Sequence, residues 1–101
     1  MDKKALKNVA AKLRKAADIK LRKDLKSYPE RNGDDADMRT MFREDCRDAH
    51  RVARLLEWNM PVAAVEHMRD MDTAARDAVG NMLEKNSKRF YKKYVDEGYA
   101  Y

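Results

Sequence analysis

The 101-residue sequence contains few residues that break helices or crosslink a chain: three Gly, two Pro and one Cys. A single Cys excludes a disulfide within the chain and favours a reducing compartment, so we expect a cytoplasmic protein. The scarcity of Gly and Pro favours long helices over strands joined by tight turns. The sequence therefore predicts an all-α protein.

Long apolar runs are absent as well. No window of the sequence approaches the apolar length that a membrane-spanning helix needs, and the first residues lack the apolar core of a signal peptide, so we expect no membrane association. The sequence also lacks a P-loop, G-x-G-x-x-G, H-E-x-x-H and G-x-S-x-G. We therefore expect a protein that is not an enzyme, with no catalytic residues and no cofactor.

The stretch from Asp37 to Asn59 carries the clearest helical pattern. Its apolar residues recur at a spacing of three and four, which places them on one face of a helix. They are Met38, Met41, Phe42, Cys46, Ala49, Val52, Ala53 and Leu56. We expect this stretch to form the central helix of the domain, ending near Trp58.

The segment before it predicts a second long helix. Asp2 is a suitable N-cap and Pro29 stops helix propagation, so this helix should run from Asp2 or Lys3 to Ser27. The connecting loop, residues 29–35, contains a turn dipeptide, followed by Asp34 or Asp35 as the N-cap of the central helix. A loop this short makes the two helices antiparallel neighbours.

After the central helix, Pro61 suits the first turn of a new helix. Residues 61–97 form either one helix or two, the second starting at Thr73 with Asp72 as its N-cap. We favour the break near 69–72, because Asp-x-Asp-Thr is typical of a helix N-terminus. The sequence thus predicts a single domain over 1–101, a small antiparallel bundle of three to four helices.

The formal net charge of +5 is unevenly distributed. Residues 1–28 hold ten Lys and Arg against three Asp, a net +7, whereas residues 29–72 hold seven Arg against eleven acids, a net −4. Residues 73–101 hold six basic and four acidic residues, a net +2. Such an asymmetry indicates a cationic surface that meets nucleic acid, an acidic protein or an anionic surface.

Cationic side chains near both ends of the chain are the predicted binding residues. In the second group they alternate with aromatic residues, a pattern that suits both phosphates and stacked bases. The candidates are Lys4, Lys7, Arg14, Lys15, Arg22, Lys26, Lys85, Lys88, Arg89, Lys92, Lys93 and Tyr91, with Lys12 and Lys23 as further cations of the first helix. A solvated helix face without any ligand explains the same charges about equally well.

The function predicted from this pattern is stoichiometric, non-catalytic binding of nucleic acid or of a complex that handles nucleic acid. The alternative is a protein–protein regulator or inhibitor that blocks a larger partner with an acidic surface. Seven Met residues and many Arg residues suit an adaptable protein interface.

Cys46 and His50 are four residues apart, so both can lie on one face of a helix. That spacing suits two ligands of a zinc ion, but His67 is the only other His and there is no second Cys. We therefore expect no metal site, and we expect the chain to fold without metal.

Two further predictions concern burial. Asp45 lies within the apolar arc of the central helix, so we expect it to be partly buried and paired, with Lys20 as the candidate partner. The alternative is that Asp45 lies at the edge of the interface and is hydrated. Phe90, Tyr91, Tyr94 and Val95 lie beyond the expected reach of the other helices if residues 61–97 form one helix. An exposed apolar patch there predicts a homodimer formed through the C-terminal helix.

Overall fold

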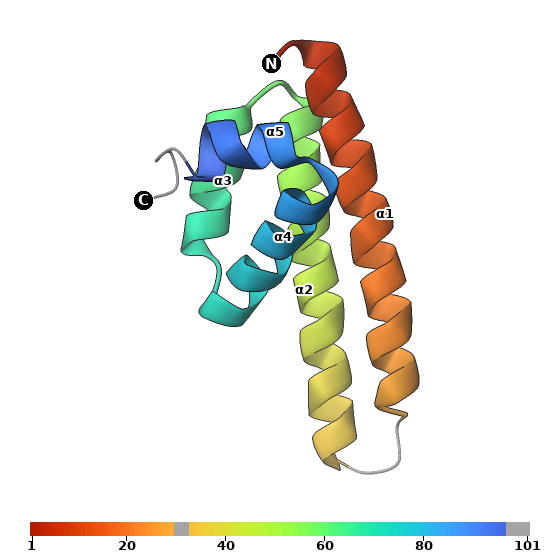
Figure 1. Cartoon of the computed structure of the whole chain (residues 1–101). Coiled ribbons are helices and arrows are strands. Elements are labelled where there is room, and N and C mark those ends of the chain that lie inside the picture. The colour runs from red at the N-terminus through yellow and green to blue at the C-terminus, as the bar shows by residue number, and fades with distance from the viewer. Residues whose placement is uncertain (30–32, 97–101) are drawn as a thin grey trace.

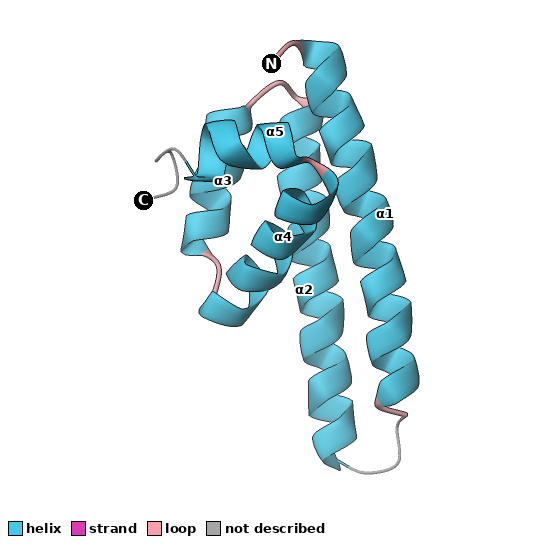
Figure 2. Cartoon of the chain, viewed as in Figure 1, coloured by secondary structure: helices cyan, strands magenta, loops and turns pink. Residues whose placement is uncertain are grey.

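The computed structural model describes residues 1–29 and 33–96, and these residues form helices without strands (Figure 2). The prediction of an all-α protein is therefore confirmed. The elements are α1 (Lys3–Ser27), α2 (Gly33–Glu57), α3 (Pro61–Asp70), α4 (Thr73–Asn86), the short α5 (Lys88–Phe90) and the π-helical segment η1 (Tyr91–Asp96).

Helices α1 and α2, 25 residues each, form a long antiparallel hairpin (Figure 1). The later helices pack on one side of it, α4 against α1 and α3 against α2. They lie beside the half of the hairpin that holds the N-terminus, so the other half projects beyond them (Figure 1). The result is an elongated molecule of 46 × 24 × 21 Å.

Both ends of α1 are held by side chains. Asp2 accepts a hydrogen bond from the backbone N–H of Ala5 at 2.8 Å, as the sequence predicted for an N-cap. At the other end, the Arg39 guanidinium of α2 donates to the carbonyl oxygens of Leu25 and Tyr28, at 2.7 and 2.8 Å. These carbonyls lie in the last turn, where a helix leaves its acceptors unpaired and favours a positive charge.

The two predicted breaks after α2 are confirmed. The chain reverses at Asn59, which has a φ of 60°, and Pro61 begins α3. Asp72 caps α4 by accepting from the N–H of Ala75 at 3.0 Å, so the alternative of one helix over 61–97 is wrong. Helix α2 already includes Gly33, before the predicted start, and the side chains of Asp34 and Asp35 lie outside the described residues.

The core lies where α3, α4 and the C-terminal segment meet the hairpin. Apolar residues at helical spacing on each helix face this region, which explains why the amphipathic pattern predicted the packing faces. The largest fully buried side chains are Phe90, Leu6, Leu13, Leu56, Leu83, Val52, Val65, Val79 and Val95.

A further break at Ser87 was not predicted, and it overturns the expected exposed patch. The chain turns there, and α5 and η1 fold back so that Phe90 and Val95 become fully buried and Tyr94 retains 8% of its exposure. The rings of Phe90 and Tyr94 pack with centroids 4.9 Å apart. The expectation of an exposed apolar patch is therefore wrong, because these side chains belong to the core of the same chain, and the homodimer stays a prediction without this support.

Asp45 is half-buried, as predicted, but its predicted partner is engaged elsewhere. Lys20 forms an ion pair with Asp24, one turn along α1, and its ammonium also lies 5.7 Å from the centre of the Phe42 ring. Burial and the nearby Asp72 raise the pKa of Asp45. The expected Lys20–Asp45 pair is thus wrong, because Lys20 forms its ion pair with Asp24 on the same face of α1.

Candidate functional site

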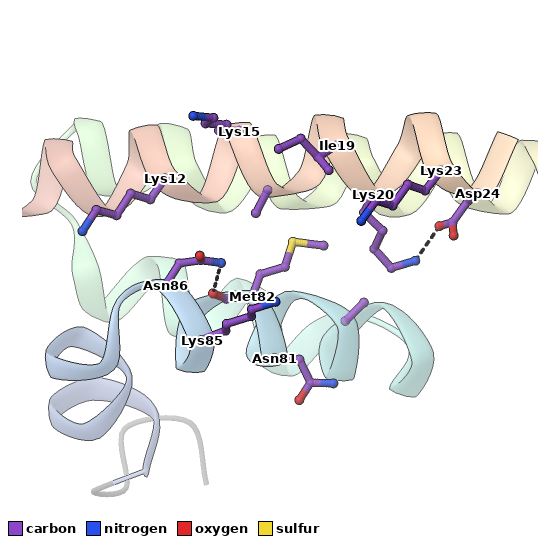
Figure 3. A pocket seen from close by; sticks show the side chains of 12 residues that line it. Lys12, Lys15, Ile19, Lys20, Lys23, Asp24, Asn81, Met82, Lys85 and Asn86 are labelled. Atoms are coloured by element: carbon purple, nitrogen blue, oxygen red, sulfur yellow. Dashed lines mark hydrogen bonds and ion pairs between the residues drawn. The ribbon is translucent and has the colours of Figure 1, made fainter. Parts of the chain in front are cut away.

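A groove of about 770 Å³ runs between α1 and α4 (Figure 3). Five of its lining residues are lysines: Lys12, Lys15, Lys20 and Lys23 from α1, and Lys85 from α4. The apolar part of its lining consists of Ala16, Ile19, Ala78 and Met82, and Asn81 and Asn86 add amide groups.

Helical spacing explains why these residues share one groove. Lys12, Lys15, Ile19 and Lys23 follow one another at intervals of three or four, so they line the same side of α1. On α4, Ala78, Met82 and Lys85 do the same. The small side chains of Ala16 and Ala78 leave space between the two helices. The longer lysine side chains form part of the lining of that space.

The charge in the groove is largely uncompensated. Asp24 is the one carboxylate among the described residues that line the groove, and it pairs with Lys20. Among the described residues, no carboxylate forms an ion pair with Lys12, Lys15, Lys23 or Lys85. Four lysines from two helices therefore line one concave surface without forming an ion pair to any described carboxylate.

The structure brings together only some of the predicted binding residues. Lys15 and Lys85 line the groove, together with Lys12 and Lys23. Exposed cations that do not line it are Lys4, Lys7, Arg22 and Lys26 of α1, and Lys88, Arg89, Lys92 and Lys93 of α5 and η1. Tyr91 is half-buried against the core. Lys20 and Asn81 also line the groove but were not among the predicted binding residues, although Lys20 follows Ala16 by one turn.

Arg14 differs from the other predicted binding residues because its guanidinium is engaged within the protein. It points toward α2, where its guanidinium donates to both carboxylate oxygens of Glu57, at 2.9 and 2.8 Å. Its Nη1 also donates to Nδ1 of His50 at 2.6 Å. Arg14 is therefore half-buried and committed to intramolecular contacts, which removes it from the surface available to a ligand.

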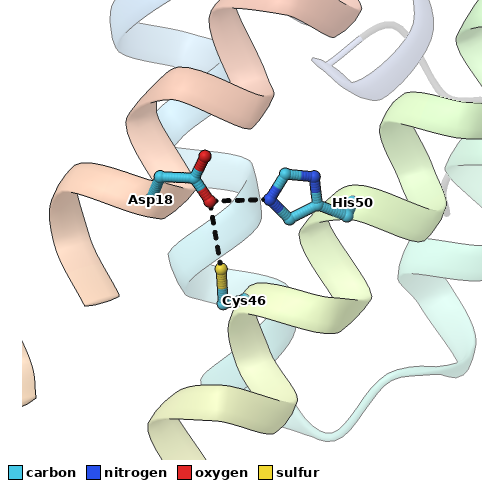
Figure 4. Close-up of side chains that lie close together, drawn as sticks. All are labelled: Asp18, Cys46 and His50. Carbon is cyan, nitrogen blue, oxygen red and sulfur yellow. Dashed lines mark hydrogen bonds and ion pairs between the residues drawn. The ribbon is translucent and has the colours of Figure 1, made fainter. Parts of the chain in front are cut away.

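His50 links Arg14 to a second set of side chains (Figure 4). Because a guanidinium only donates, Nδ1 of His50 must accept, and the ring proton resides on Nε2. Nε2 then donates to Oδ1 of Asp18 at 2.8 Å. The same oxygen accepts from the Cys46 thiol, with Sγ 3.7 Å away. The polar cluster of Arg14, Asp18, Cys46, His50 and Glu57 thus joins α1 to α2.

The pKa shifts follow from these contacts. The hydrogen bond from His50 lowers the pKa of Asp18, and the hydrogen bond from Arg14 lowers the pKa of Glu57. Burial, together with the negative charge of Asp18, raises the pKa of the Cys46 thiol. Since the thiolate is the nucleophilic form, this environment is unfavourable for a catalytic cysteine.

The polar cluster also brings three types of metal-binding group together. One ligand atom each from Asp18, Cys46 and His50 lie within 4.8 Å of one another. Only Cys46 and His50 could be paired from the sequence, because Asp18 is 28 residues away from Cys46 and on another helix. No local spacing in the sequence signals that contact.

No protein-family model, curated protein or solved structure matches this chain. Within the described residues, no helix combines the length and apolar character that spanning a membrane requires.

Proposed function

We propose that the protein binds single-stranded nucleic acid stoichiometrically through its phosphate backbone, without catalysing a reaction, in the groove between α1 and α4. The observation that carries this proposal is the set of four groove lysines, Lys12, Lys15, Lys23 and Lys85, which have no carboxylate partner among the residues that the structure describes. A positively charged groove that follows a phosphate backbone is a common solution for binding single strands.

The lining of the groove favours backbone contacts over recognition of bases. The described residues that line it include lysines, which act as point charges, and no arginine or aromatic side chain. Of the C-terminal aromatics, Tyr94 is buried in the core and offers no stacking surface. We therefore expect binding that is insensitive to base sequence and strongly dependent on salt.

A single strand suits the groove better than a duplex. Two packed helix axes lie about 8–10 Å apart, so the space between their side chains is narrower than a double helix. Exposed lysines outside the groove, such as Lys26 and Lys88, extend the positive surface at the two ends of a bound strand. The single cysteine favours action in a reducing compartment, for which we propose the cytoplasm.

Fluorescence anisotropy with a labelled single-stranded oligonucleotide, measured over a range of salt concentrations, tests the proposal. Replacing Lys12, Lys15 and Lys23 by Gln removes three positive charges from the groove. The slope of log affinity against log salt should become less steep by about 2, because each phosphate contact with a single strand contributes about 0.7.

The matched control replaces Arg43, Arg47 and Arg54 by Gln. These exposed α2 residues do not line the groove, and their loss changes the net charge by the same amount. Equal losses of affinity in the two variants would show that binding follows net charge alone, which contradicts a site in the groove.

The apolar part of the groove lining supports a second candidate, the protein–protein regulator. Ala16, Ile19, Ala78 and Met82 would suit the apolar side of an acidic, amphipathic helix from a partner protein. In this case the wild-type chain should bind an acidic helical peptide and show no oligonucleotide binding at physiological salt. The groove variant should then lose the peptide, whereas the α2 control should retain it.

A further inference from the structure

We propose that Asp18, Cys46 and His50 form a binding site for a divalent transition-metal ion of the zinc class, with solvent as the fourth ligand. This inference concerns the polar cluster between α1 and α2 and does not depend on the nucleic-acid proposal. It revises the expectation of no metal site, which rested on only two of the three ligands.

The geometry of two packed helices carries the proposal. Cys46 and His50 lie one turn apart on α2, and Asp18 faces them from α1 (Figure 4). Asp18 Oδ1 is 2.8 Å from His50 Nε2 and 3.7 Å from Cys46 Sγ, and all three ligand atoms lie within 4.8 Å. Zinc bonds of about 2.0–2.3 Å place tetrahedral ligand atoms roughly 3–4 Å apart. The three groups therefore need only small side-chain shifts to share one ion.

The chemistry of the ligand atoms selects the class of metal. One thiolate sulfur, one imidazole nitrogen and one carboxylate oxygen match zinc, whereas calcium and magnesium prefer oxygen alone. The Asp18 side chain remains 52% exposed, so water can reach the remaining position. Three protein ligands with one solvent ligand is the arrangement of open zinc sites.

Metal binding changes the protonation of two ligands. The Cys46 thiol must lose its proton, and the proton on His50 Nε2 must move to Nδ1, so that one proton is released for each ion bound. The proton competes with the metal for the thiolate, and the apparent affinity should therefore rise with pH.

Arg14 opposes this change. Its guanidinium donates to Nδ1 of His50 and so stabilises the tautomer in which Nε2 carries the proton. A metal-bound His50 instead carries a proton on Nδ1, which cannot accept from Arg14. Arg14 must then leave His50, although its two hydrogen bonds to Glu57 can persist. Loss of the guanidinium should therefore strengthen metal binding.

The full chain, kept reduced by a reagent without thiols, is titrated with Co²⁺, and Zn²⁺ affinity is measured against a chromophoric chelator. We expect a thiolate-to-cobalt absorption band, which requires Cys46 as a ligand. Cys46→Ser should abolish the band, and Asp18→Asn should weaken Zn²⁺ binding by about tenfold or more. Arg14→Met, which keeps the length of the side chain without its donors, should tighten Zn²⁺ binding by about tenfold.

His67→Gln is the matched control, since it removes the other imidazole and should leave the binding of Co²⁺ and Zn²⁺ unchanged. Thermal unfolding of each metal-free variant confirms that the chain is folded. The proposal is overturned if the wild-type chain gives no cobalt–thiolate band at millimolar Co²⁺. It is equally overturned if Cys46→Ser and Asp18→Asn bind Zn²⁺ as tightly as the wild type, or if Arg14→Met does not bind it more tightly.

Discussion

Arg14 and Glu57, 43 residues apart in the sequence, form a two-pronged ion pair that joins the middle of α1 to the last turn of α2. Both side chains keep about a third of their exposure, 31% and 37%, so solvent screens the pair. A double-mutant cycle with Arg14→Met and Glu57→Gln should give a coupling free energy of about 0.5–1 kcal/mol, decreasing with salt.

The pair should also show in the pH dependence of stability. The hydrogen bond from Arg14 lowers the pKa of Glu57 below its ordinary value of 4.5, so the pair stabilises the folded chain above that pH. The stabilisation should disappear as the pH falls through the pKa of the folded state. Urea unfolding of the wild type and of Glu57→Gln at pH 7 and pH 3 measures this loss. If the two proteins differ in their free energy of unfolding by the same amount at both pH values, the Arg14–Glu57 pair does not cause the pH dependence.

Replacing Asp45 by a neutral residue should stabilise the protein. Burial raises the pKa of its carboxyl, Asp72 adds repulsion, and Lys20 is paired with Asp24. We predict that Asp45→Asn raises the free energy of unfolding at pH 7 by about 0.5–1 kcal/mol. The gain should fade below the ordinary pKa of 3.8, where the carboxyl is protonated in both folded and unfolded chains.

Glu44→Gln serves as the control for Asp45, because it removes the same charge from the adjacent exposed position. Chemical denaturation of both variants should show a gain for Asp45→Asn alone. Destabilisation by Asp45→Asn would mean that the carboxylate has a favourable partner after all.

Arg39 should contribute to stability by capping α1. Arg39→Met removes the hydrogen bonds to the carbonyl oxygens of Leu25 and Tyr28 while keeping most of the aliphatic chain. We expect the free energy of unfolding to fall by about 1–2 kcal/mol, since these are charge-assisted bonds at a partly exposed helix end. Arg43→Met, at the next turn of α2 and exposed, should change it by less than about 0.5 kcal/mol.

The C-terminal aromatics should behave as core. Phe90 is fully buried, so Phe90→Ala should lower the free energy of unfolding by about 3–5 kcal/mol. Trp58, by contrast, keeps 63% of its exposure, and Trp58→Ala should change stability little. Thermal unfolding at several protein concentrations separates this account from a dimer interface. A melting temperature of Phe90→Ala that equals that of the wild type in dilute solution would contradict it.

The sequence by itself determined the helices and most of their boundaries. Asp2, Pro29, Pro61 and Asp72 act on the backbone within one turn of their own position, so their effects can be read locally. The apolar spacing along α1 and α2 likewise identified which face of each helix is buried. The concentration of lysine in α1 predicted a cationic surface, though not its shape.

The tertiary structure alone decided which side chains meet. The turn at Ser87 lets Phe90 become buried in the core. This burial outweighs the helical pattern of the sequence, which continues through this position. The groove requires α4 to lie along α1 so that Lys85 approaches Lys12 and Lys15. The contact of Asp18 with Cys46 and His50 depends on how far α1 is rotated and shifted along α2. A rotation of one residue, about 100°, would separate these groups, because helical periodicity defines faces within a helix and leaves the alignment between helices to packing.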